Sequence, residues 1–132
     1  MPLYICNSRA GTIPEPARAE IAADITRIHC EVTGAPPQFV HAFFLEDAAS
    51  PPLDGGRRAI VAGSIRGGRN AGQKQAIIDG IRASIVTHTG IPLDETAVVT
   101  TDVPASWAME GGEVMPEPGE EAAWLAAHAA SG

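Results

Sequence analysis

The chain has 132 residues, which is enough for one domain with a modest hydrophobic core. Its formal net charge of −7 argues against a nucleic acid or an anionic membrane as a partner, because both attract basic surfaces. No apolar run is long enough to cross a bilayer, no signal-peptide pattern opens the chain, and two cysteines do not make a disulfide framework, so we expect a soluble cytoplasmic protein.

The first part of the chain, residues 1–46, predicts a strand, a helix and a second strand. The first strand is expected at Leu3–Ser8. The helix should begin between residues 12 and 16, where Thr12-Ile13-Pro14-Glu15 has the form of a capping box, and should end at Thr33-Gly34. Apolar residues at helical spacing should face the core: Ala17, Ile21, Ile25, Ile28 and Val32. The second strand is expected over residues 38–46.

Residues 59–103 repeat this plan. A strand is expected over residues 59–65, a helix at Ala71–Thr89 and a strand at Thr96–Val103, and the helix stop Thr33-Gly34 recurs as Thr89-Gly90. The pattern predicts an α/β fold, an α+β sandwich of two consecutive βαβ units that form a four-stranded sheet with two helices on one face. Alternate residues of a strand face opposite sides of the sheet, and residues 39–45 include apolar side chains on both sides. The other face of the sheet should therefore also be covered, most simply by oligomerisation.

The last segment, residues 104–132, has a different composition, with glycine, proline and finally an alanine-rich run. We expect it to be a C-terminal arm of the same single domain, which spans residues 1–132. The arm should end in a short helix over residues 120–129 and either pack on a neighbouring chain or cover a site.

Pro2 is the first candidate for chemistry, because it directly precedes an apolar strand and follows the initiator methionine. If Met1 is removed, Pro2 carries a free secondary amine, and an α-amino group titrates near ~8, close enough to neutrality for proton transfer. Burial would favour the neutral amine, a base, whereas nearby carboxylates would favour the cation, an acid. The alternative is that Pro2 only begins the strand, where its missing N–H group costs nothing.

Arg66 and Arg69 lie between the end of a predicted strand and the start of a predicted helix. Ligands of parallel sheets collect at the carboxyl ends of strands, and arginine can bind a carboxylate through two hydrogen bonds. The two arginines are therefore candidates for a carboxylate clamp. No Walker motif is present, so phosphate is a weaker candidate, and solvated loop arginines are the alternative.

The remaining candidates are His29 and Glu110. His29 lies near the end of the first helix beside its apolar stripe, where a histidine could be a packed residue or a catalytic group. Glu110 belongs to an acidic tail and by itself could be a solvated carboxylate. No two histidines show metal-ligand spacing, so we expect no metal, and we expect no other cofactor.

With these residues in place, the chain resembles the tautomerase superfamily and, within it, the cis-3-chloroacrylic acid dehalogenase group. The resemblance extends to about residue 119 and rests on the following residues in order: Pro2, Asp24-Ile25-Thr26-Arg27-Ile28-His29, Val32-Thr33-Gly34, Arg66-Gly67-Gly68-Arg69 with Ala71, Val103-Pro104-Ala105, Glu110, and Pro116-Glu117-Pro118-Gly119. It implies a tautomerase-like fold of two βαβ units in one chain, assembled as a homotrimer.

The resemblance also implies roles for individual residues. Pro2 is similar to the catalytic N-terminal proline, Arg66 and Arg69 to the substrate-carboxylate clamp, and His29 to the group that helps hold or polarise that carboxylate. Glu110 is similar to the residue that activates water in the dehalogenases. The chain departs from that group at Val99, where the dehalogenases have a tyrosine that assists water activation.

Three functions remain open at this point. The leading one is keto-enol tautomerisation of a small unsaturated or enolic carboxylate, with Pro2 moving the proton. The second is hydration or dehalogenation of a cis-3-substituted acrylate, with Glu110 activating water and cationic Pro2 donating a proton. The third is a non-catalytic trimeric protein that binds small acids. The first two require that Met1 is removed, because the Pro2 nitrogen is otherwise an amide.

Overall fold

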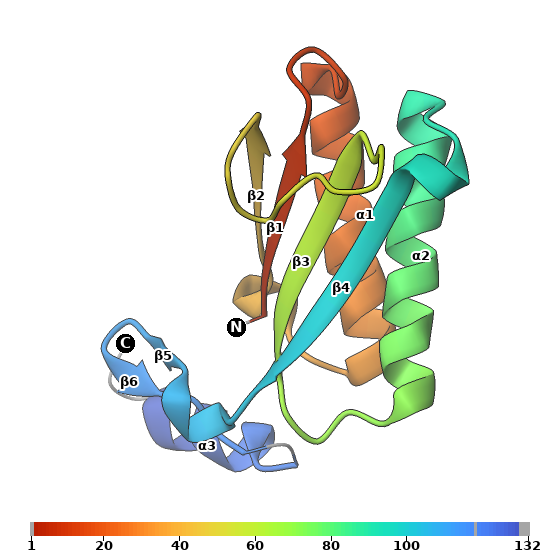
Figure 1. The fold of residues 1–132 in the computed structure, drawn as a ribbon. Coiled ribbons are helices and arrows are strands. Elements are labelled where there is room, and N and C mark those ends of the chain that lie inside the picture. The colour runs from red at the N-terminus through yellow and green to blue at the C-terminus, as the bar shows by residue number, and fades with distance from the viewer. Residues whose placement is uncertain (1, 118, 130–132) are drawn as a thin grey trace.

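A central β-sheet organises the computed structural model, which describes residues 2–117 and 119–129 (Figure 1). Met1, whose removal an active Pro2 requires, lies outside the described residues, as do Pro118 and residues 130–132. The strands are β1 (Leu3–Ser8), β2 (His41–Glu46), β3 (Ala59–Arg66) and β4 (Thr96–Val103), in the order β2-β1-β3-β4. The pairs β1–β2 and β3–β4 are parallel, and the central pair β1–β3 is antiparallel. The predicted pair of βαβ units is confirmed.

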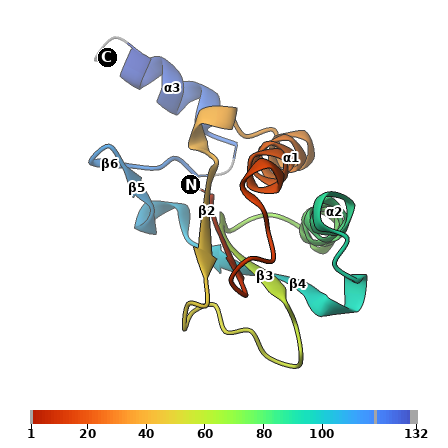
Figure 2. The same cartoon turned by 90° about the horizontal axis from the view of Figure 1, so that it is seen from above.

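Both long helices cover the same face of the sheet, as the sequence predicts (Figure 2). Helix α1 spans Glu15–Thr33 and helix α2 spans Ala71–Thr89. Each ends at a glycine in the left-handed region, Gly34 with φ 77° and Gly90 with φ 75°, where a side chain would be strained. None of the described helices is both long and apolar enough to cross a membrane.

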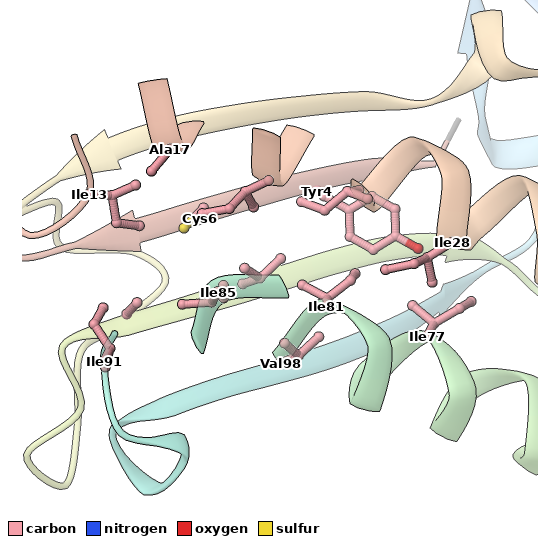
Figure 3. Close-up of a cluster of buried hydrophobic side chains, with 14 of the residues drawn as sticks. Tyr4, Cys6, Ile13, Ala17, Ile28, Ile77, Ile81, Ile85, Ile91 and Val98 are labelled. Atoms are coloured by element: carbon pink, nitrogen blue, oxygen red, sulfur yellow. The ribbon is translucent and has the colours of Figure 1, made fainter. Parts of the chain in front are cut away.

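The core lies between this sheet face and the two helices (Figure 3). Ile21 and Ile25 of α1 and Ile77, Ile81 and Ile85 of α2 are fully buried against residues of β1 and β3. Burial of each such side chain contributes about 2 kcal/mol, so these stripes stabilise the packing of both helices on the sheet. The helical spacing of isoleucines therefore sets how both helices pack.

Two details of the predicted elements are wrong. Thr12-Ile13-Pro14-Glu15 is not a capping box, because the N-cap of α1 is Pro14, which makes no side-chain hydrogen bond. Pro16 in the first turn lacks an N–H group, so fewer backbone N–H groups at this helix end need a hydrogen-bond partner. A capping box forms instead between Asn70 and Gln73 of α2. The second strand is also shorter than predicted, because Pro37–Phe39 forms a 3-10 helix, η1.

The C-terminal arm extends from the end of β4, beyond the edge of the helix–sheet core (Figures 1 and 2). It comprises a 3-10 turn, η3 (Ala105–Trp107), a small hairpin of β5 (Met109–Glu110) and β6 (Glu113–Val114), and helix α3 (Glu121–Ala129). A short 3-10 turn, η2 (Leu93–Glu95), precedes β4. The predicted terminal helix is confirmed, whereas the hairpin was not predicted.

The arm is held to the body by aromatic contacts. Trp124 of α3 packs edge-on against Phe39 of η1, with ring centroids 6.2 Å apart, and donates its indole N–H to the Val114 carbonyl at 3.0 Å. His128 stacks on the same tryptophan. These contacts place α3 beside the end of the sheet at which β1 begins.

Candidate active site

The antiparallel pairing of β1 with β3 brings the predicted site residues to one end of the sheet. Leu3 pairs with Ser64, so Pro2 lies beside the point where β3 ends and the loop to α2 begins. The side chain of Pro2 is buried, and its carbonyl accepts a hydrogen bond from the His41 N–H at 3.0 Å. The strand start and the arginine-bearing loop, which are far apart in sequence, are therefore neighbours in the fold.

His29 reaches this end of the sheet from α1. Its side chain is almost fully buried, and its Nδ1 lies 2.7 Å from the hydroxyl oxygen of Tyr4. The two rings pack edge to face, with centroids 5.7 Å apart. Burial, together with the positive charges of Arg69 and Arg66, lowers the pKa of His29 to about 4, so the imidazole is neutral at physiological pH.

The hydrogen bond to Tyr4 fixes which nitrogen of His29 carries the proton. Burial raises the pKa of the Tyr4 hydroxyl well above its ordinary value, despite the opposing charge of Arg69, so Tyr4 remains a donor. The buried hydroxyl hydrogen of Tyr4 needs an acceptor, and Nδ1 of His29 is the partner found for it among the described residues; with Tyr4 donating, Nε2 of the neutral imidazole carries the N–H group. The arrangement leaves His29 with one hydrogen-bond donor that can bind an anion.

Arg69 adds a positive charge to this pair. It is partly buried, and its Nε is a buried nitrogen without a hydrogen-bond partner among the described residues. Burial and the neighbouring charge of Arg66 lower the pKa of Arg69, while Glu121 and Tyr4 act in the opposite direction. An unsatisfied buried guanidinium N–H beside a neutral histidine is suited to receive a carboxylate.

Arg66 is placed differently from Arg69. Its side chain is only 4% exposed, and it donates hydrogen bonds to the Pro116 carbonyl and, at 2.7 Å, to Oε1 of Glu121 in α3. The loop after β3 is also fastened to β4 through a hydrogen bond from the Gly67 N–H to the Val103 carbonyl, at 2.9 Å. In this structure Arg66 thus holds a carboxylate of its own chain.

Glu110 lies on the other, uncovered face of the sheet, where it lines a cavity of about 500 Å³. Gly111 and Gly112, both with positive φ, form the tight turn between β5 and β6 that presents it. Most of the lining is apolar, with Leu3, Phe43, Val103 and Met109 among the residues. Since Leu3 follows Pro2, this cavity adjoins the strand start, whereas His29 approaches the same end from the helix-covered face.

Val99 does not line the Glu110 cavity. Val103, at the end of β4, is a lining residue of that cavity, but Val99 lies nearer the middle of the strand, is 49% exposed and borders a separate pocket with Arg57 and Arg82. The resemblance implies that a tyrosine at position 99 would assist Glu110 in activating water. Within one chain, a side chain at position 99 does not lie in the Glu110 cavity, so it is not in place to assist Glu110 there.

Two residues of this region were missed by the sequence reading. Tyr4 could have been found, because it is the only tyrosine and lies on the same side of β1 as Pro2 by strand alternation. Glu121 carried no such signal, since it is one of many carboxylates in an acidic tail. Among the described residues, no group of three His, Cys, Asp or Glu side chains is arranged to hold a metal ion.

Comparisons with known proteins identify the family and the fold. Residues 61–115 match the family model described as "Tautomerase enzyme". A solved structure of a protein called N1, a member of the cis-3-chloroacrylic acid dehalogenase family, is 31% identical, with a TM-score of 0.83 over 94% of this chain and 90% of that chain. A second, native Ps01740, is 38% identical, with a TM-score of 0.73 over 82% of this chain and 99% of that chain.

More distant structures share the fold. A fused 4-OT solved as a symmetric trimer is 20% identical, with a TM-score of 0.73 over 86% of this chain and 94% of that chain. A comparison with curated protein sequences found no significant match.

Proposed function

Because the chain belongs to the tautomerase superfamily and, within it, to the cis-3-chloroacrylic acid dehalogenase group, we propose that it is an N-terminal-proline enzyme that acts on small unsaturated or enolic carboxylates. Its main reaction is keto-enol tautomerisation. The observation that carries the proposal is the position of buried Pro2 on the strand whose Tyr4 orients His29 beside Arg69.

The substrate carboxylate binds to Arg69, with the Nε2–H group of His29 as a second donor. The unsatisfied Nε of Arg69 supports this assignment, because a buried donor without a partner costs free energy until a ligand pairs with it. The neutral state of His29 also supports this assignment. Because the pKa of His29 is about 4, its protonation does not change near pH 7, and its N–H group can hold the carboxylate equally well at all pH values near neutrality. The bound acid then presents its α-carbon and β-carbon to Pro2.

Pro2 moves the proton. In the enol form of a 2-hydroxy-2-alkenoate, the neutral amine takes the proton of the hydroxyl group, and the resulting ammonium returns a proton to C3 as the ketone forms. Burial and the positive charges of two nearby arginines both disfavour a second cation, so they favour the neutral form of the Pro2 amine, which is the base. The burial of Pro2 therefore favours tautomerisation over a reaction that needs the cationic proline.

The second candidate is hydration or dehalogenation of a cis-3-substituted acrylate. The observation in its favour is that Glu110 lines the 500 Å³ cavity together with Leu3, the residue after Pro2, so a water molecule activated by Glu110 could attack an acrylate bound near the proline. The resemblance, with Val99 in place of the group's tyrosine, predicts that this activity is weak, although Val99 does not line the Glu110 cavity within one chain. A third candidate, a non-catalytic small-acid binding protein, keeps the carboxylate site and makes no use of the Pro2 amine.

We also infer that the protein assembles as a homotrimer. Phe43 and Leu45 lie on the uncovered sheet face and are 56% and 41% exposed, and a face of this kind is normally buried by association. The fused 4-OT of the same fold is a trimer. Sedimentation velocity tests this inference: a monomer at micromolar concentration contradicts it.

The central test compares the wild type with Pro2→Ala after intact mass has established that Met1 is absent from both. Alanine keeps a terminal amine but changes a secondary amine to a primary one and alters its geometry, so turnover of enol-pyruvates should fall about 100-fold or more. An unchanged turnover, or a native protein that retains Met1, would exclude both enzymatic candidates and leave the binding protein.

A substrate panel then separates the candidates. Enol-pyruvates and cis- and trans-3-haloacrylates should be tested with the wild type, with Arg69→Ala and with the control Arg9→Ala, which removes an exposed arginine from the other end of β1. We expect Arg69→Ala alone to lose activity on carboxylates. Titration of the Pro2 amine by NMR distinguishes the two reactions, because a cationic Pro2 at pH 7 favours the hydratase.

A further inference from the structure

The ion pair between Arg66 and Glu121 has a consequence for the charge of the substrate. Arg66 is 4% exposed and Glu121 22% exposed, and their side-chain nitrogen and oxygen lie 2.7 Å apart. The second carboxylate oxygen of Glu121 accepts a hydrogen bond from the Gly119 N–H at 2.8 Å, and Pro116 supplies a carbonyl to Arg66. Both oxygens of Glu121 are therefore in use, and the carboxylate is held in place by the arm that carries it.

Glu121 is ionised in this arrangement. Burial acts to raise its pKa, but hydrogen bonds from the backbone N–H groups of Glu121 and Gly119 and from Arg66 together hold the pKa of the carboxyl below its ordinary value. The charge of Arg66 is consequently balanced within the chain at neutral pH. Arg69 has no such partner for its Nε among the described residues, so it is the arginine left for a ligand.

We propose that Glu121 is a specificity-determining residue that limits the carboxylate site to substrates with one negative charge. The inference rests on the proposed function, because it concerns the same carboxylate site. A monocarboxylate meets Arg69, whose Nε has no partner among the described residues. A dicarboxylate brings a second negative charge toward a region where Arg66 is already paired and Glu121 is itself negative.

The size of the effect follows from the short distances involved. Glu121, Arg66 and Arg69 are close enough for their charges to influence one another. A unit charge a few ångströms from a partly buried group changes a binding constant by about tenfold or more. Replacing Glu121 with the isosteric, neutral glutamine should therefore raise affinity for a second carboxylate by about that factor.

The test uses maleate and maleamate, which have the same skeleton and differ by one charge at slightly alkaline pH. Their dissociation constants should be measured by calorimetry for the wild type, for Glu121→Gln and for the control Glu120→Gln. Glu120 is exposed and makes no side-chain hydrogen bond or ion pair with the described residues, so its variant removes the same charge from outside the site. We expect wild type and Glu120→Gln to prefer maleamate, and Glu121→Gln to shift the ratio about tenfold toward maleate.

A second variant should shift the maleate-to-maleamate affinity ratio in the opposite direction. Arg66→Gln leaves the charge of Glu121 without its partner, so it should shift the ratio further toward maleamate. A purely structural role of the ion pair predicts the same effect on both ligands in either variant. If Glu121→Gln is poorly folded, as judged by circular dichroism, the double variant Arg66→Gln/Glu121→Gln is compared with Arg66→Gln, because the two differ only in the charge of Glu121; an equal maleate-to-maleamate ratio in both overturns the role of Glu121.

The results separate this inference from the function it rests on. An unchanged maleate-to-maleamate ratio in Glu121→Gln, with maleamate still bound through Arg69, overturns the role of Glu121 and leaves the carboxylate site intact. Maleamate binding that survives in Arg69→Ala overturns the carboxylate site itself, and the inference with it.

Discussion

The hydroxyl oxygen of Tyr4 lies 2.7 Å from Nδ1 of His29, and this contact joins the first strand to the end of the first helix across 25 residues of sequence. It determines which nitrogen of a buried neutral imidazole carries the proton, because the Tyr4 hydroxyl occupies Nδ1 and leaves the N–H group on Nε2. Tyr4 thus acts on the candidate site through a direct hydrogen bond to His29.

The first prediction concerns this contact. Tyr4→Phe removes the hydroxyl donor, so Nδ1 loses its partner and both tautomers of His29 become populated. We expect KM for an enol-pyruvate to rise severalfold and the free energy of unfolding to fall by about 1 kcal/mol, the net contribution of one hydrogen bond. Steady-state kinetics and urea denaturation measure the two effects. An unchanged KM would mean that His29 does not hold the carboxylate.

The second prediction concerns the pH dependence of stability. The pKa of His29 is about 4 in the folded protein and 6.5 for an ordinary histidine, so the unfolded chain binds a proton between these values while the folded chain does not. This contribution to stability is fully present above pH 6.5 and is lost as pH falls toward 4. The total loss is about 3 kcal/mol.

Denaturation with urea at several pH values tests this, with His29→Gln as the reference. Carboxylates also titrate in the acidic part of this range, and the reference subtracts their effect. The stability of the wild type relative to the variant should decline between pH 6.5 and pH 4. Parallel pH profiles of the two proteins would contradict a buried neutral His29.

The third prediction concerns Gly63, which pairs with Tyr4 across β1 and β3. A Cβ atom at position 63 would lie 2.5 Å from Cε1 of the Tyr4 ring, closer than atoms can approach. Gly63→Ala should therefore displace the tyrosine, lower stability by about 1–3 kcal/mol and weaken the contact to His29. Thermal unfolding and the kinetics used for Tyr4→Phe provide the readout.

Gly80→Ala is the matched control for that substitution. Its Cβ would lie 3.1 Å from Cδ1, 3.2 Å from Cγ2 and 3.3 Å from Cγ1 of Ile28, so it also meets a tight contact, but with a different neighbour. Its effect on KM should be smaller than that of Gly63→Ala, because the atoms nearest to position 80 belong to Ile28 and not to Tyr4. Equal kinetic effects of the two substitutions would show that the loss comes from general destabilisation.

The fourth prediction concerns the contact between the helices. Asp24 of α1 accepts hydrogen bonds from Ser84 at 2.8 Å and from His88 at 2.9 Å, both in α2. Burial acts to raise the pKa of Asp24, but these hydrogen bonds and the charges of His88 and Arg27 lower it overall. Asp24→Asn should reduce stability at neutral pH by about 1–2 kcal/mol.

The difference between wild type and Asp24→Asn has a defined pH dependence. A carboxylate with a lowered pKa stabilises the fold above its unfolded pKa, near ~4, and this stabilisation is lost as pH falls through the folded pKa. Urea denaturation should therefore show a gap that narrows below pH 4. Glu31→Gln, which breaks an exposed ion pair with Arg27, should cost less than about 0.5 kcal/mol.

The sequence alone was sufficient for the four strands of the main sheet, the two long helices and the layers that they form, apart from the start of the second strand. Isoleucines at helical spacing mark the buried faces of α1 and α2, and Thr33-Gly34 and Thr89-Gly90 end these helices because glycine adopts the left-handed conformation without strain. Pro2, Arg66 and Arg69 could also be named as candidates from the sequence, because each lies next to a predicted strand end or helix start and such ends can be located from neighbouring residues alone. The hairpin at Glu110 was not predicted, because two-residue strands carry almost no pattern.

Only the tertiary structure decided what each candidate contacts. The sequence could pair Arg66 with Arg69 as a clamp, but the fold gives Arg66 a carboxylate from Glu121, 55 residues away, and leaves the Nε of Arg69 without a partner among the described residues. Tyr4 and His29 meet for the same reason: strand order and helix packing set these distances. The net charge around a site depends on the distances between charged groups in the folded chain, and residues that are close in sequence do not determine these distances.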